Sequence, residues 1–126
     1  MSASINKVTI VGNLGGDPEI RSLGGDERVA NFRVATSETW RDRETGERKE
    51  ATEWHRVVVF NEHFVKTVER MLKKGTTVYL EGQLKTRKWT DNAGVEKYST
   101  EIVIPKFGGE LKVLTGGKGR DDQSEG

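Results

Sequence analysis

The segment Thr52–Trp89 (TEWHRVVVFNEHFVKTVERMLKKGTTVYLEGQLKTRKW) predicts a strand, a helix and a second strand in direct succession. Trp54–Phe60 is rich in valine and aromatic residues, as strands are. Asn61 can cap a helix, because its side-chain oxygen accepts a bond from an otherwise unpaired backbone N–H. Gly75 is expected to end this helix, and a long alternating strand then runs to Trp89. The helix has apolar residues at helical spacing, namely Phe64, Val65, Val68, Met71 and Leu72.

The chain before this segment indicates two strands and two connections. Val8–Val11 is an apolar, β-branched run, and Val29–Ala35 alternates between apolar and polar side chains. The glycine-containing stretch between them, residues 13–26, is typical of a long connection. Residues 38–52 are almost wholly polar. They predict an extended, hairpin-like loop with a turn at Thr45-Gly46.

The chain after Trp89 indicates a turn and two more strands. Asp91–Gly94 is typical of a tight turn, and the strand after it places Tyr98, Thr100, Ile102 and Ile104 on one face. A short last strand is expected at Leu111–Leu114. Apart from this short last strand, the order of three strands, one helix and two strands favours an all-β OB-fold. This is a five-stranded Greek-key barrel with one helix between its third and fourth strands.

Composition limits the size and class of the protein. One domain is expected for 126 residues, and a hydrophobic content of 33% implies a modest core that burial in an oligomer could supplement. The net charge of +1 does not by itself indicate nucleic acid. The absence of cysteine excludes disulfides and thiolate metal sites. With no membrane-spanning run or signal-peptide pattern, a cytoplasmic protein is expected.

Three tryptophans lie beside cationic residues. Trp40 precedes Arg41, Trp54 lies in TEWHR, and Trp89 ends KTRKW. Flat rings can stack on bases while cations contact phosphates, as in proteins that bind single-stranded nucleic acid. Side chains two apart on a strand share a face. The faces so predicted hold Trp54, Arg56, Val58 and Phe60 on one strand, and Lys85, Arg87 and Trp89 on another.

Each of these aromatic residues also has a structural interpretation. For their strand, the alternative is that Trp54 and Phe60 point into the core and that Arg56 is a solvated surface residue. Burial of Trp89 would require it to leave a cationic face. Trp40, on a polar loop, fits either stacking or packing over the barrel edge. Further candidate phosphate contacts, each also explained as solvated surface charge, are Arg33, Arg43, Arg48, Lys49 and Lys74.

No pattern in the sequence supports catalysis, a metal site or a cofactor site. The two histidines, His55 and His63, have no second histidine at metal-ligand spacing. The carboxylates of residues 42–53 are interleaved with Arg and Lys, as in a solvated loop. The glycine-rich segments lack the Lys-Ser ending of a phosphate-binding loop. A non-enzymatic protein without metal or cofactor is expected.

Four segments together closely resemble bacterial single-stranded DNA-binding proteins. They are Asn6–Glu19 (NKVxIVGNLGxDPE), Ala35–Asp42 (ATSETWRD), Thr52–Phe60 and Val78–Trp89. The likeness runs from about Asn6 to Leu114, in the same order. It implies a homotetramer of OB-folds that binds single-stranded DNA with little sequence preference. Such a protein protects and organises strands in replication, recombination and repair, in the cytoplasm with the nucleoid.

The resemblance also implies roles for individual residues. The stacking aromatics it implies are Trp40, Trp54, Phe60 and Trp89. The basic positions near DNA are Lys49, Arg56, Lys74 and Arg87, to which the strand patterns add Lys85 and Arg33. A subunit interface is expected at His55, Asn6, Lys7, Val8 and Tyr79. Residues 1–114 are therefore expected to form the domain for DNA binding and oligomerisation.

The likeness ends before the C-terminus. The family usually continues through a Gly/Gln/Pro-rich linker to an acidic tip that docks replication and repair proteins. This sequence ends GKGRDDQSEG instead, so weak recruitment of such partners is expected. Residues 115–126 have no hydrophobic side chain and are expected to be a disordered tail remnant.

Three other functions are compatible with the residues alone. One is an OB-fold module that binds proteins of a replication assembly, with feeble DNA binding that does not depend on aromatic rings. Another is an RNA-binding OB domain, because nothing in the sequence distinguishes recognition of a 2′-hydroxyl. A nuclease is the least supported, since no catalytic pattern is present.

Overall fold

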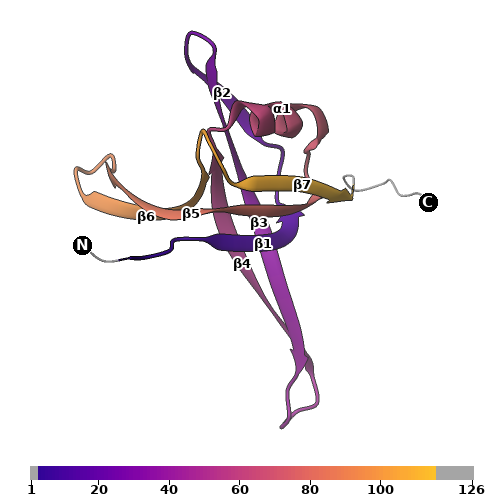
Figure 1. Cartoon of the computed structure of the whole chain (residues 1–126). Helices are drawn as coiled ribbons and strands as arrows, with labels where there is room; N and C mark the ends of the chain where they lie inside the picture. Colours follow the sequence, from indigo (N-terminus) through magenta and orange to yellow (C-terminus); the bar gives the residue numbers. More distant parts are fainter. Residues whose placement is uncertain (1–2, 116–126) are drawn as a thin grey trace.

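The computed structural model describes residues 3–115, which form seven strands and one helix (Figure 1). The elements are β1 (Val8–Leu14), β2 (Glu19–Gly24), β3 (Glu27–Arg41), β4 (Arg48–Val59), α1 (Glu62–Met71), β5 (Thr77–Thr90), β6 (Glu96–Ile104) and β7 (Glu110–Thr115). The β2–β3, β3–β4 and β5–β6 hairpins project from the body in three directions (Figure 1). The expected tail lies outside the described residues, apart from Thr115, which ends β7.

Five of the strands pair in a ring. β1 pairs antiparallel with β3, β3 with β4, β5 with β6, and β1 with β5, while β4 pairs parallel with β6. This order is that of the OB-fold, and α1 lies between the third and fourth strands of the ring along the chain. The predicted fold class is confirmed. β2 and β7 are additions to the ring, paired with β3 and β5 respectively.

One prediction for the connecting segments was wrong, and another was right about the hairpin but wrong in expecting a loop. The stretch 13–26 contains β2, whose Ile20 pairs with Ala30 and packs against the core. Residues 38–52 are mostly strand, because β3 and β4 stay paired as far as Arg41 and Arg48. A two-stranded ribbon with both faces in water needs no alternation of apolar and polar residues. Its polar sequence therefore resembles that of a loop. The predicted turn is confirmed: Gly46 has φ +75° and its N–H donates to Asp42 O at 2.8 Å.

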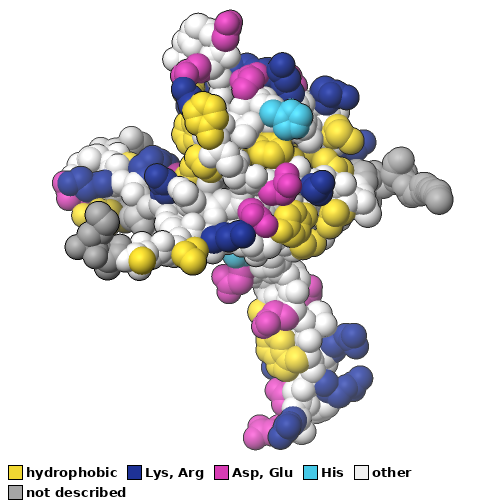
Figure 2. All heavy atoms as spheres, in the orientation of Figure 1, with side chains coloured by type: hydrophobic (Ala, Val, Ile, Leu, Met, Phe, Trp, Pro, Cys, Tyr) yellow, Lys and Arg dark blue, Asp and Glu magenta, His cyan; other side chains and the backbone are white. Residues whose placement is uncertain are grey.

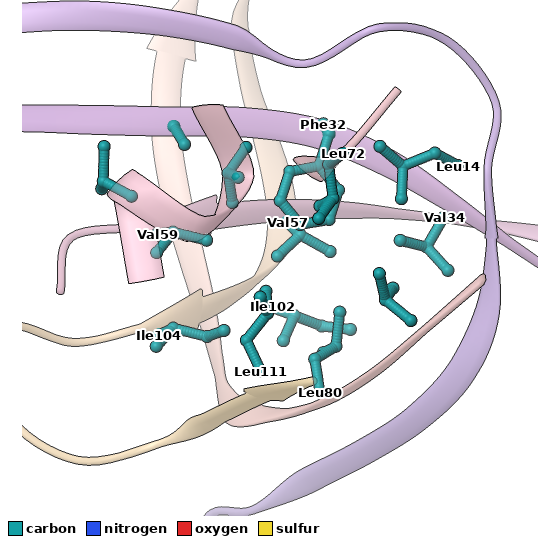
Figure 3. Packing of buried hydrophobic residues seen from close by; sticks show 14 residues of the cluster. Leu14, Phe32, Val34, Val57, Val59, Leu72, Leu80, Ile102, Ile104 and Leu111 are labelled. Atoms are coloured by element: carbon teal, nitrogen blue, oxygen red, sulfur yellow. The ribbon is translucent and has the colours of Figure 1, made fainter. Parts of the chain in front are cut away.

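The core lies inside the ring and beneath α1 (Figure 3). Phe32 and Val34 of β3 point toward Val57 of β4 and Leu80 of β5 (Figure 3). Val57 and Val59 are fully buried there, whereas Val58 belongs to a separate cluster on the opposite face of β4. This alternation determines which side chains of β4 face outward.

The helix begins as predicted and ends earlier than predicted. Asn61 Oδ1 accepts bonds from the N–H groups of His63 and Phe64, so the predicted cap is confirmed. The helix ends at Met71 because Leu72 is already extended, with ψ 137°. Gly75, with φ +91°, lies in the turn that follows.

Candidate nucleic-acid interface

An open groove lies on the outer face of the strands β2, β3, β4, β5 and β6. It has a volume of about 890 Å³, and its apolar residues include Val29, Val58 and Val103, against which Phe60 packs. Its lining includes five basic residues and two acidic ones, namely Arg21, Arg56, Lys85, Arg87 and Lys106 against Glu19 and Glu101. The groove therefore combines an apolar surface with an excess of positive charge.

Strand alternation explains why the groove has this lining. Val57 and Val59 are buried in the core, so Arg56 and Val58 must face outward. On β5, Leu80 is buried inward, which turns Lys85 and Arg87 toward the groove. The sequence predicted two separate strand faces, one with Arg56 and Phe60 and the other with Lys85 and Arg87. The structure places these four residues in one groove.

Glu101 is a groove residue that sequence reasoning missed. Its side chain is only 8% exposed, and its Oε2 accepts a bond from Arg87 Nη2 at 2.9 Å. This hydrogen bond raises the pKa of Arg87 above its ordinary value and fixes the guanidinium over the groove. Glu101 is two positions before Val103 on β6 and shares its face, so the period-two pattern could have placed it in the groove.

Trp54 lies beside the groove with its ring held on two sides. The residue is 51% exposed, and Arg33 Cζ is 4.8 Å from the ring centroid, a cation–π contact. The ring also lies against Gly15, where an added Cβ would be 2.2 Å from Trp54 Cζ3. Arg33 and Arg56 line a smaller hollow next to the groove. Trp54 is thus an exposed ring with a defined orientation among cations.

Trp89 lies near the far end of β5. It is 40% exposed and, by alternation, shares the outward face of Lys85 and Arg87. Its partner in the ladder is Lys97 of β6. The aromatic and basic residues of this strand therefore follow one another away from the groove and along the β5–β6 hairpin.

Six predicted residues do not line the groove: Trp54, Arg33 and Trp89, described above, and Trp40, Lys49 and Lys74. Trp40 lies on β3 and not on the predicted loop, and it pairs with Lys49 of β4. Trp54 pairs with Ala35, which is an odd number of positions, five, before Trp40 on β3. By alternation, Trp40 and Trp54 therefore lie on opposite faces of the ribbon. The β3–β4 hairpin carries basic and acidic side chains near its tip and apolar side chains nearer the barrel (Figure 2). The backbone N–H of Lys74 donates to Asp17, in the connection from β1 to β2.

Most of the predicted interface residues gather along the seam between β1 and β5. Asn6 bonds both the N–H and the C=O of Leu84, Lys7 pairs with Glu81 at 3.6 Å, and Val8 pairs with Gly82. Tyr79 Oη donates to Glu81 at 2.6 Å. This bond lowers the pKa of Glu81 and raises that of Tyr79.

His55 is separate from this seam. It lies on β4 beside β3, and its Nε2 is 2.9 Å from Thr36 Oγ1. Among residues 3–115 there is no group of three or more His, Asp or Glu placed to hold a metal ion. The one helix in the described part of the chain is too short and too polar to cross a membrane.

Comparisons with known proteins agree with this architecture. Residues 5–108 match the model of the single-strand binding protein family. A single-stranded DNA-binding protein of Rhizobium meliloti (strain 1021) is 56% identical over 116 residues, which are 92% of this chain and 67% of the relative. A single-stranded DNA-binding protein of Rickettsia typhi (strain ATCC VR-144 / Wilmington) is 51% identical over 126 residues, covering all of this chain and 82% of the relative.

A solved structure shows the same fold. It is a Plasmodium falciparum SSB complex with ssDNA, and the match covers 90% of this chain and 98% of the chain in that structure. The TM-score is 0.82 and the sequence identity is 42%. From the family match and the two relatives, this chain belongs to the single-strand binding protein family.

Proposed function

We propose that this protein binds single-stranded DNA through the groove and the aromatic rings beside it, with little sequence preference. The observation that carries this proposal is the groove itself, in which Phe60 lies among five basic and two acidic residues. Bases stack on aromatic faces whatever their identity, while cations neutralise the phosphates. Family membership supports DNA as the ligand, since the Plasmodium falciparum relative is a complex with ssDNA.

The strand is proposed to follow a path longer than the groove. Trp54 with Arg33 extends it on one side, and Trp89 extends it along β5. Trp40 and Lys49 lie on the opposite face of the β3–β4 ribbon, so a strand contacting them as well must pass around that hairpin. Lys74 is the remaining proposed phosphate contact.

Residues 1–114 act in this proposal as one domain for DNA binding and assembly. The assembly is a homotetramer, with contacts at His55 and along the seam formed by Asn6, Lys7, Val8 and Tyr79. The protein protects strands and keeps them from re-annealing during replication, recombination and repair. It works in the cytoplasm, associated with the nucleoid. It is not an enzyme; release of fragments from a labelled strand incubated with magnesium would contradict this.

Intrinsic tryptophan fluorescence tests the proposal directly. Titration with oligo-dT is expected to quench the fluorescence strongly, oligo-U less, and duplex DNA only slightly. Raising the salt concentration should weaken binding, with a log–log slope of about −0.7 per neutralised phosphate. No quenching by oligo-dT at low salt would mean that the tryptophans are structural and would favour the protein-binding alternative.

Alanine variants then identify which rings stack. Trp54→Ala and Trp89→Ala should each weaken binding of labelled oligo-dT by about 1–3 kcal/mol per stacked base, because the ring is lost. Both side chains are substantially exposed, so thermal unfolding and tetramer mass should change little. Unchanged affinity in either variant would remove that ring from the site.

A further inference from the structure

Phe107 is among the most exposed large hydrophobic residues in the described part of the chain. It is 89% exposed, in the connection between β6 and β7. Gly108 and Gly109 follow it with φ +102° and +75°, a backbone conformation that other residues rarely adopt. The chain turns there, and Phe107 remains outside the core. Its ring therefore contributes little to the core and is accessible to a ligand.

The surroundings of Phe107 are continuous with the groove. Phe107 lines a hollow of about 190 Å³ together with Phe60 and Leu23. Phe60, Leu23 and Lys106 also line the large groove, so the two spaces meet at Phe60. The Phe60 N–H donates to Ile104 O at 2.8 Å, which ties the end of β4 to the strand preceding Phe107. The groove therefore does not end at Phe60.

The charges around this hollow are already paired with one another. Arg28 bonds Glu62 and Glu69 at 2.9 Å each, and Lys106 bonds Glu27. Both basic residues lining the hollow have an acidic partner, whereas Arg56 and Lys85 in the groove have none among residues 3–115. A phosphate gains little in such a place, whereas the face of a base can pack on an aromatic ring.

We infer that Phe107 forms an additional base-stacking position, which receives a base of the bound strand immediately beyond Phe60. The inference rests on the proposed DNA-binding function and extends its path toward the β6–β7 connection. The position contributes stacking and no phosphate contact. It therefore adds affinity without adding to the salt dependence of binding.

The first test compares affinities for labelled oligo-dT by fluorescence anisotropy over a range of salt concentrations. Phe107→Ala is expected to weaken binding about 5- to 150-fold, the range for loss of one stacking ring, with an unchanged salt slope. Met71→Ala is the matched control, because Met71 is an exposed apolar residue on α1 that lines neither space. It should bind as the unaltered protein does.

The second test places a reporter at the position itself. A variant with Phe107→Trp and with Trp40, Trp54 and Trp89 changed to Phe keeps a ring at every proposed position and has one indole. Oligo-dT should quench that indole, and duplex DNA should not. Normal affinity in Phe107→Ala, or binding without quenching of the single indole, would overturn the role of Phe107 and leave the proposed function intact. Failure of the unaltered protein to bind oligo-dT would overturn both.

Discussion

Gly15 illustrates how one small residue determines the position of a large one. Its missing side chain makes room for the edge of the Trp54 ring, and Arg33 contacts the same ring. A ring held at two places presents its free surface in one orientation, which reduces the entropy lost when a base stacks on it. The orientation of Trp54 therefore depends on residues far from it in the sequence.

Gly15→Ala is expected to weaken binding of oligo-dT although every aromatic ring is retained. The new Cβ would meet ring carbons of Trp54 at 2.2 and 2.7 Å, so the ring must move. The matched control is Gly16→Ala, since nothing lies within 4 Å of a Cβ there. A lower affinity and a shifted tryptophan emission in the first variant only, with similar thermal unfolding of both, would agree. Equal affinities would show that the orientation of Trp54 is unimportant.

Tyr79→Phe is expected to raise the pKa of Glu81 toward its ordinary value. The Tyr79 hydroxyl donates to the ionised carboxylate, and this bond is the main cause of the lowered pKa. A lowered pKa in the folded state stabilises the fold above the unfolded pKa, and this contribution is lost as the pH falls through the folded pKa. NMR titration of the Glu81 carboxyl measures the shift. An unchanged titration would assign the lowered pKa to Lys7 instead.

Individual side chains were predictable where one strand alone determines their direction. Alternation placed Arg56, Lys85 and Arg87 correctly on outward faces. It could not show that Arg33 contacts Trp54 or that Glu101 bonds Arg87, because each pair joins two strands whose register the sequence does not reveal. The same limit applies to Gly15, which meets Trp54 only when the end of β1 pairs with β3 and β3 pairs with β4.

At the scale of elements, the β3–β4 ribbon and the helix differed in how well they could be predicted. The helix carries its own signals, since the cap at Asn61 and the apolar spacing both lie within a short stretch. The outer part of the ribbon carries none, because both of its faces are in water and its polar residues need no pattern. Its stability comes from continuous pairing with the barrel portions of β3 and β4.

Gly12→Ala is expected to destabilise the junction of β1 with β3. A Cβ at this position would be 2.4 Å from Ala35 O and 2.7 Å from Val34 Cγ1, so the two strands must separate. Overpacking of this kind typically costs about 1–3 kcal/mol, and occasionally more. Urea unfolding measures the loss, with Gly16→Ala as the control. Equal midpoints for the two variants would contradict the close approach of these strands.

At the scale of the whole molecule, the two proposed interface regions lie at different places on the barrel. The seam residues are on β1 and β5, whereas His55 is on β4 next to β3. A closed ring can present two such surfaces at once, and two distinct contacts are sufficient to build a tetramer from one kind of subunit. The ring, its single helix and the short last strand β7 were predictable from the sequence, but the added strand β2 was not.

His55→Tyr is expected to shift the assembly toward smaller species at low protein concentration. The change removes the bond to Thr36 and places a longer side chain at the proposed contact. Sedimentation velocity over a concentration series measures the shift. His63→Tyr is the matched control, because His63 is exposed on α1. A variant at His55 that remains fully tetrameric at low concentration would contradict the interface role.

The pairing of β1 with β5 also has a consequence for folding kinetics. Val8 pairs with Gly82, 74 positions later, and most of β1 has no other partner in the ring. During synthesis the first strand must wait for most of the domain before its ladder can form. The chain has to lose the entropy of a long loop before that contact stabilises it, which slows folding in proteins dominated by distant pairings. The strand that is synthesised first is therefore among the last to be locked in place.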